Sequence, residues 1–252
     1  MKAATTIGHD SEFGLAQKGI IRSALDVFGN DVYEDEDGRY FADNLNTEIA
    51  INPCSTLKDF HSKTEGLLGK VRDRGFDLVM EPTIKYPKSC LKHPLAFESG
   101  CNPDISAYTE DINRPPVFSE MDGIRSCGAH IHTGDLESDP INQSKWMDAL
   151  ITLPLLFKEK PSSRRSMYGG AGCLRYKPYG MEYRVLSNVW LDSHELREFV
   201  WERTHKALEL SKSTSFHDIE DWHEVPTAID NHDLSLASKL IDRLYMYGVT
   251  SL

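Results

Sequence analysis

The sequence predicts an α+β fold built on one mostly antiparallel sheet. Segments with the alternation of strands and segments with helical apolar spacing follow one another without strict strand–helix–strand order. The chain has 252 residues, of which 40% are hydrophobic and 27% charged, enough for a large core. The glycine signatures of dinucleotide-binding and P-loop folds do not occur. With no repeat or linker in the sequence, we expect residues 1–252 to form a single domain.

The first third of the chain predicts strands around one helix. Thr5–Leu15 and Asn44–Asn52 have strand character, and the acidic run Tyr33–Asp37 is typical of a turn between two strands. Leu57–Arg74 places apolar residues at helical spacing, and Phe76–Tyr86 predicts a further strand.

The remainder predicts longer loops between the regular elements. We expect a loop at Pro87–Glu120, a strand at Ile124–Gly134, a helix at Pro140–Lys158, a glycine- and arginine-rich loop at Pro161–Pro178 and a strand at Gly180–Leu191. Asp192, with Glu195 three residues later, predicts the start of a helix to about Leu210. Asp233 is expected to cap a last amphipathic helix that ends at Gly248.

Composition excludes several classes of protein. The net charge of −11, from 28 basic and 39 acidic residues, opposes direct binding to nucleic acid, which depends on Lys and Arg. No apolar run reaches the length of a membrane span, and the N-terminus lacks the apolar segment of a signal peptide. The five cysteines are scattered, without a CxxC pair. A cytoplasmic protein that contacts no membrane is therefore expected.

Polar residues two positions apart recur within four predicted strands. The pairs are Asp10 and Glu12, Asn46 and Glu48, His130 and His132, and Glu182 and Arg184. Residues i and i+2 of a strand share a face, and the residues between these pairs are largely apolar. Carboxylates gathered on one face repel unless cations neutralise them, and oxygen ligands with one imidazole suit Mg²⁺ or Mn²⁺. A salt-bridged sheet face remains the alternative for any single pair.

A second cluster is basic. Its members fall within 21 residues and surround three glycines: Arg164, Arg165, Arg175, Lys177 and Arg184. In an acidic protein such a cluster favours a site for phosphates or carboxylates, although an ordinary surface loop is the alternative for Arg164 and Lys177.

Three motifs, GHDSEFGL, SCGAHIHTG and GGAGCLRYKPYGMEYRVLSN, resemble those of the bacteriophage type 2 carboxylate–amine (COOH·NH2) ligases. These belong to the glutamine synthetase and glutamate–cysteine ligase superfamily, and the resemblance spans about Thr5 to Asn188. It implies a curved, mostly antiparallel sheet with helices on its apolar face. ATP and divalent metals would occupy an open funnel on the other face. The implied reaction is phosphorylation of a carboxylate by ATP, followed by displacement of phosphate by an amine.

The resemblance also implies roles for individual residues. Glu12, Glu48, His130 and Glu182 would be metal ligands, assisted by Asp10, and His132 would contact the phosphates of ATP. Arg175 and Arg184 would stabilise the transferring phosphoryl group and hold the acyl substrate. Arg165 is a further catalytic candidate, and Lys177 joins Arg175 and His132 as a nucleotide-binding candidate. Asp10 stands where the superfamily commonly has glutamate. The chain is also too short for the ring assembly of glutamine synthetase.

The sequence therefore predicts an ATP- and Mg²⁺-dependent ligase, with Mn²⁺ as an alternative metal, whose substrates are a small carboxylate and an amine. The carboxylate would belong to an amino acid or peptide, and the amine could be free or part of a peptide, modified nucleotide or glycan. The loop Pro87–Glu120 and the segment Ser211–Asp233 are expected to select the acceptor. A metal-dependent hydrolase using the same face, and a non-catalytic phage scaffold, are the alternatives. Neither substrate nor the oligomeric state follows from the sequence.

Overall fold

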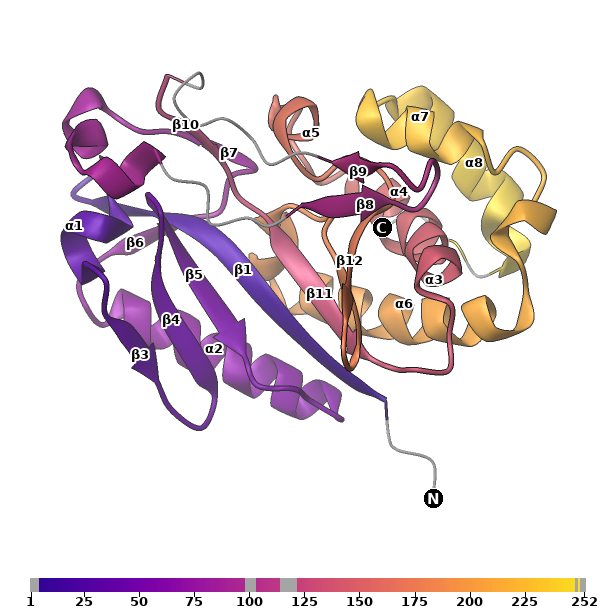
Figure 1. The fold of residues 1–252 in the computed structure, drawn as a ribbon, viewed down its shortest axis with the longest axis horizontal. Coiled ribbons are helices and arrows are strands. Elements are labelled where there is room, and N and C mark those ends of the chain that lie inside the picture. The colour runs from indigo at the N-terminus through magenta and orange to yellow at the C-terminus, as the bar shows by residue number, and fades with distance from the viewer. Residues whose placement is uncertain (1–4, 98–102, 114–121, 248, 250–252) are drawn as a thin grey trace.

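The computed structural model describes residues 5–97, 103–113, 122–247 and 249. Its main feature is an open sheet in which every pairing between described strands is antiparallel (Figure 1). Along its main path the strand order is β3-β4-β5-β1-β11-β13-β12-β8-β9, and β2 and β6 pair with β1 beside that path. β7 and β10 form a separate ribbon. The predicted α+β class with a mostly antiparallel sheet is confirmed.

The strands have the following bounds: β1 (Thr6–Gln17), β2 (Ile20–Arg22), β3 (Val32–Glu34), β4 (Gly38–Asp43), β5 (Asn46–Ile51), β6 (Asp77–Val79), β7 (Thr83–Lys85), β8 (Asp104–Ser106), β9 (Ile112–Asn113), β10 (Ile124–Ser126), β11 (Ala129–Gly134), β12 (Cys173–Lys177) and β13 (Gly180–Tyr183). The helices are α1 (Ala24–Phe28), α2 (Leu57–Arg72), α3 (Pro140–Met147), α4 (Leu153–Leu155), α5 (Arg164–Met167), α6 (His194–Ser213), α7 (Glu224–Asp230) and α8 (Leu234–Leu244). A single π-helical turn, Asp148–Thr152, joins α3 to α4.

Several predicted boundaries are wrong. The strand predicted at Phe76–Tyr86 is split into β6 and β7, which pair with different partners. The loop predicted at Pro87–Glu120 contains 3₁₀ turns and the short strands β8 and β9, which are too short to show alternation. The strand predicted at Gly180–Leu191 ends at Tyr183 and is followed by a 3₁₀ turn.

The predicted loop Pro161–Pro178 is also wrong, because it contains α5 and β12. β12 and β13 form a hairpin in which Lys177 faces Gly180 across a two-residue connection. Gly180 has φ of 148°, and a Cβ there would lie 2.1 Å from the carbonyl oxygen of Thr133. Only glycine fits this position.

The capped helices start close to where the sequence predicts. Thr56, Asp139, Ser193 and Asp233 each accept a hydrogen bond from a backbone N–H in the first turn of the following helix. For α6 the cap is Ser193, and the prediction of Asp192 is off by one residue. Gly248, the predicted end of the last helix, lies outside the described residues.

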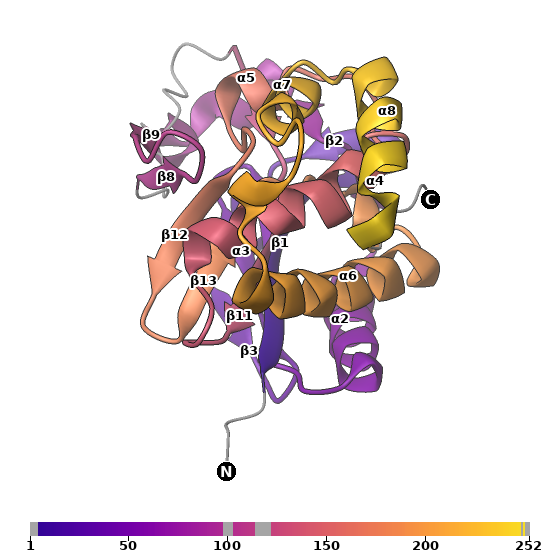
Figure 2. The same cartoon turned by 90° about the vertical axis from the view of Figure 1, so that its right-hand side faces the viewer.

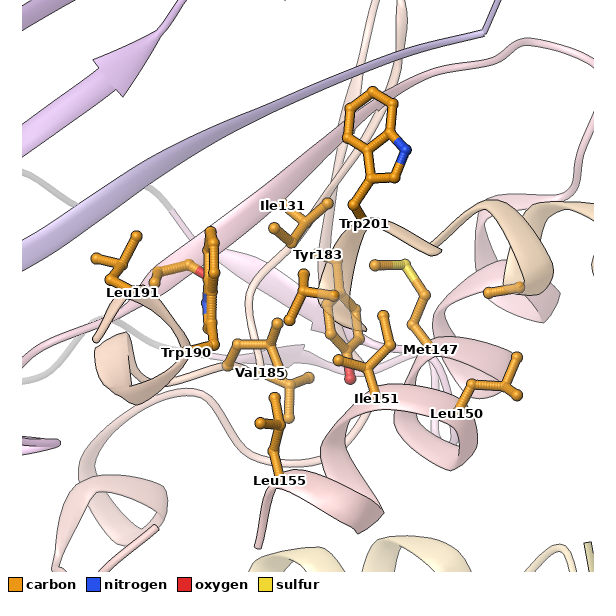
Figure 3. Packing of buried hydrophobic residues seen from close by; sticks show 14 of the residues in the cluster. Ile131, Met147, Leu150, Ile151, Leu155, Tyr183, Val185, Trp190, Leu191 and Trp201 are labelled. Atoms are coloured by element: carbon orange, nitrogen blue, oxygen red, sulfur yellow. The ribbon is translucent and has the colours of Figure 1, made fainter. Parts of the chain in front are cut away.

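Helices cover one face of the sheet. α2 contacts β4 and β5, α3 contacts β12 and β13, and α6 packs against both helices. Figure 2 shows α2, α3 and α6 on the same side of the strands. Beneath them Ile7, Phe13, Ile49, Ile131 and Tyr183 are fully buried, as their alternation with the polar pairs predicts. Figure 3 shows Ile131, Tyr183 and Trp190 within this core.

None of the helices in the described ranges is long and apolar enough to cross a membrane. All cysteines in the same ranges are free and buried: Cys54, Cys90, Cys127 and Cys173.

Candidate functional site

The strand register brings the predicted polar pairs together on the face opposite the helices. Glu12 on β1 lies directly opposite Glu48 on β5, and Asp10 lies opposite His130 on β11. His132 faces Glu182 on β13, which in turn faces Arg175 on β12. Because opposed residues of neighbouring antiparallel strands share a face, these pairings form one continuous polar surface.

Three carboxylates form an acidic cluster at one side of this surface. Single oxygen atoms of Glu12, Asp43 and Glu48 lie within 4.8 Å of one another. None of the three forms an ion pair with another described residue. Burial and the neighbouring Asp43 raise the pKa of Glu12 to about 8, and burial followed by Asp10 and Asp43 raises the pKa of Glu48 well above its usual value. A bound divalent cation would stabilise the charged form of such buried, closely spaced carboxylates.

Asp43 was missed by the sequence analysis, although a signal exists. It ends β4 and pairs with Asn46 across a tight hairpin, so it shares the face of Asn46 and Glu48. Arg39, Phe41 and Asp43 are two positions apart along β4, so they too are expected to share one face of the strand.

Asp10 joins the two histidines of β11. Its Oδ1 lies 2.8 Å from Nδ1 of His130 and its Oδ2 lies 2.9 Å from Nε2 of His132. Burial alone would raise the pKa of Asp10, but the two histidines hold it well below its usual range. Burial and then Arg184 lower the pKa of His130, which favours the neutral imidazole that can bind a metal.

His130 has one ring nitrogen that is available to a ligand. Its Nε2 is buried and has no hydrogen-bond partner in the described part of the chain. At Gly128 an added Cβ would lie 2.3 Å from this nitrogen, so glycine keeps the space beside it clear. The oxygen ligands of the acidic cluster suit a hard divalent cation such as Mg²⁺ or Mn²⁺, and an imidazole nitrogen is compatible with either metal.

Three basic residues meet at Glu182, and we call Arg175, Lys177 and Arg184 the basic group. Lys177 Nζ lies 2.6 Å and Arg175 Nη1 3.3 Å from Oε2 of Glu182, and Arg184 Nη1 bonds to its Oε1. Glu182 also has an oxygen within 4.8 Å of ligand atoms of Asp10 and His132, so it links the basic group to the histidines. Arg184 Nε donates to Asp104 on β8 over 3.0 Å.

The structure does not bring Arg165 to the basic group's ion pairs. Its guanidinium lies 2.6 Å from Glu159 and donates to the carbonyl of Ile229 over 3.0 Å. Arg164 is buried and donates to the carbonyls of Val185 and Leu186, and burial lowers its pKa to about 10. Both arginines hold backbone segments in place, and a catalytic role for Arg165 stays a prediction.

A pocket of about 310 Å³ opens at the end of the polar surface beside His132 and Tyr179, and we call it the Tyr179 pocket. Its walls combine small or apolar residues with polar ones, and the further lining residues are Thr6, Gly8, His9, Asp10, Arg39, Ala50, Ile51, Pro53 and Gly134. The hydroxyl of Tyr179 lies 2.6 Å from Nδ1 of His132. Tyr179 was missed by the sequence analysis, because it falls in the hairpin connection.

The polar face thus has an acidic cluster on one side and a basic group on the other. A comparison with protein families then points to one class of protein for part of the chain. Residues 122–219 match the family model described as "Phage phiEco32-like COOH.NH2 ligase-type 2", which supports the resemblance through the two motifs that lie within this segment. The matched segment contains β11, β12 and β13 and so both histidines and the basic group. The family's name points to a carboxylate–amine ligase. A search of curated proteins returns no match.

Proposed function

We propose that this protein is an ATP-dependent carboxylate–amine ligase that uses Mg²⁺ or Mn²⁺. The observation that carries the proposal is the division of one sheet face into an acidic cluster and a basic group, joined by Asp10, His130 and His132. Transfer of a phosphoryl group from ATP to a carboxylate brings two anions together. A metal at the acidic cluster and the cations of the basic group would both reduce the repulsion between them.

The metal would be held by Glu12, Asp43 and Glu48, with His130 Nε2 as a further ligand. Bound there, it would neutralise charge on the phosphates of ATP and act as a Lewis acid on the transferring group. Asp10 orients both imidazoles of β11, because its two oxygens engage them separately. His132 is then placed between the metal ligands and the Tyr179 pocket.

The nucleotide's ring system would enter the Tyr179 pocket. Gly8 and Ala50 are small lining residues that leave room for a ring, and Ile51 and Pro53 would provide apolar contacts. Arg39 lines the same pocket and would meet phosphate or ribose oxygens there. In this arrangement the polar surface and the basic group would hold the phosphates of ATP.

The basic group would receive the substrate carboxylate and the transferring phosphoryl group. Arg175 and Lys177 keep 22% and 25% of their side chains exposed, so both can contact a ligand. Arg184 is buried beneath them and held by two carboxylates, so it supplies fixed charge. Glu182 holds the three cations together. In the second step of the reaction, the amine would attack the phosphorylated carboxylate. We propose that this reaction takes place on the polar face of the sheet, which would correspond to the funnel of a glutamine-synthetase-like fold.

The test measures products from ATP with a panel of amino acids and hydroxylamine as a small general amine. The expected result is hydroxamate, ADP and phosphate in equal amounts, with chelator abolishing all three. Arg175→Ala should lose most turnover, whereas Arg72→Ala, on an exposed arginine of α2, should keep it. Cleavage of an ester, amide or phosphoester without ATP would instead establish a hydrolase.

A further inference from the structure

A second pocket, of about 350 Å³, adjoins the basic group, and we call it the Asp230 pocket. It lies between β8, the glycine-containing segment after α5, and the end of α7. Its polar walls include Asp104, Ser106, Thr109, Asn113, Tyr168 and Asp230. Asp104 connects it to the site, because its Oδ2 accepts the 3.0 Å hydrogen bond from Arg184.

The charges around this pocket leave one carboxylate without a cation. Asp104 is paired with Arg184 and also accepts from Asn113 over 3.0 Å. Arg165, the cation in the wall, is paired with Glu159. Asp230 accepts a 2.7 Å hydrogen bond from the N–H of Ala171 and forms no ion pair with any described residue. Asp230 is therefore the carboxylate of the pocket wall that has no ion-pair partner among the described residues.

Tyr168 lines the pocket and also lies next to two residues of the catalytic side. Its ring centre lies 5.0 Å from the guanidinium carbon of Arg184 and 5.8 Å from the ring of His130. The hydroxyl oxygen of Tyr168 is buried and has no hydrogen-bond partner among the residues described. A buried hydroxyl normally has a hydrogen-bond partner, so the Tyr168 hydroxyl points to a ligand or water in the space beside it.

The geometry points to the Asp230 pocket as the subsite for the acceptor amine, and to an acceptor that carries a second, cationic nitrogen. This inference rests on the proposed function. The reacting amine would lie beside Arg184, where the acyl group is held, and the distal ammonium would pair with Asp230. An acceptor bearing a distal carboxylate would instead meet the carboxylate of Asp230 and be disfavoured.

Formation of the amide at this pocket needs no reactant besides the acyl phosphate and the acceptor amine. The neutral nitrogen of the acceptor forms a bond to the carbonyl carbon of the acyl phosphate. The bond from that carbon to the phosphate oxygen breaks, and phosphate leaves with the electron pair. The proton released from the amine is taken up by the departing phosphate, so the products are an amide and hydrogen phosphate.

The first test is direct binding at low salt, which does not depend on catalysis. Diamines from 1,2-diaminoethane to 1,6-diaminohexane and butylamine are titrated into the protein in a calorimeter. The best diamine should bind more tightly than butylamine, and Asp230→Asn should weaken it by about tenfold, as expected for a lost charged hydrogen bond. Asp242→Asn, an exposed position of α8 outside the pocket, is the matched control and should bind like the wild type.

Asparagine can still accept the N–H of Ala171, so the variant should fold normally, which thermal unfolding checks. If diamines bind no better than butylamine, or if Asp230→Asn binds them equally well, the assignment of the pocket is wrong.

The second test separates this inference from the ligase reaction. Turnover is measured with hydroxylamine, which needs no distal anchor, and with the best diamine. The ratio of the KM for the diamine to that for hydroxylamine should rise about tenfold in Asp230→Asn and stay constant in Asp242→Asn. A constant ratio in Asp230→Asn overturns the inference. If no acid gives a hydroxamate, the ligase proposal fails, and the binding measurement still decides the pocket.

Discussion

Glu182 and Arg184, two residues apart on one face of the sheet, form an ion pair with only 1% and 3% of their side chains exposed. Lys177 and Arg175 approach the other oxygen of the same carboxylate. A single buried anion therefore holds three cations next to one another. This arrangement keeps positive charge concentrated in the absence of a bound phosphate.

Replacing Glu182 by glutamine should destabilise the protein. The substitution keeps the shape of the side chain and leaves three neighbouring cations without their shared anion. Breaking a buried ion pair by removing one partner costs roughly 3–5 kcal/mol, so the urea midpoint should fall clearly. Glu209→Gln, whose carboxylate is 69% exposed beside Lys206, is the control and should leave the midpoint unchanged. An unchanged midpoint in Glu182→Gln would show that the cations do not need this anion.

Arg175 should act on the reaction more than on stability. Its side chain is 22% exposed and its contacts to Glu182 are long, at 3.3 and 3.4 Å. Arg175→Ala is expected to lower kcat by on the order of 10²-fold, the effect of removing one donor that stabilises transition-state charge. Arg175→Lys should recover only part of this loss, because an ammonium cannot reproduce the two-pronged guanidinium. Full recovery by lysine would assign Arg175 to simple charge balance.

The polar face could be predicted because strand alternation alone places it. Asp10 and Glu12, or His130 and His132, share a face in any regular strand, and the apolar residues between them indicate which face is buried. The order of the strands does not follow from this pattern. The structure is what shows β11 lying between β1 and β13.

Other parts of the site depend on long-range contacts that local sequence does not encode. Asp104 lies on a strand of three residues inside a proline-rich segment, where no alternation can show. Tyr168 and Asp230 are 62 positions apart and line one pocket only after α7 has packed. The sequence analysis names Arg165 as a catalytic candidate because it lies in an arginine-rich segment. In the structure it pairs with Glu159, six residues earlier. Such pairing across irregular backbone has no periodic signal.

Metal and nucleotide should stabilise the protein together. Mg-ATP is expected to raise the melting temperature through binding to the native state, and EDTA should abolish the gain. Glu48→Gln should remove most of the gain, because it takes one oxygen ligand and one negative charge from the acidic cluster. Glu36→Gln changes an exposed acid outside this cluster and should respond to Mg-ATP like the wild type. An undiminished shift in Glu48→Gln would place the metal elsewhere.

Asp148 should make the stability of the protein fall as the pH rises. It is fully buried in the π-helical turn, where its Oδ2 accepts the N–H of Gly172 over 2.7 Å and its Oδ1 accepts the hydroxyl of Tyr183. Burial raises its pKa from 3.8 to about 7. Between these values the native state binds a proton that the unfolded state has released. The contribution is therefore complete below about pH 4 and is lost as the pH rises through about 7, by at most about 1.4 kcal/mol per pH unit.

Asp148→Asn isolates this contribution, because the amide keeps an acceptor for Gly172 and has no proton to lose. The free energy of unfolding of both proteins is measured by urea denaturation from pH 4 to pH 8. The difference between variant and wild type should grow in favour of the variant as the pH rises toward 7, and then level off. Because Tyr183 also contacts Thr152 over 2.6 Å, its hydroxyl keeps a partner in the variant. A difference that does not change with pH would mean that Asp148 has the same protonation in the folded and unfolded states.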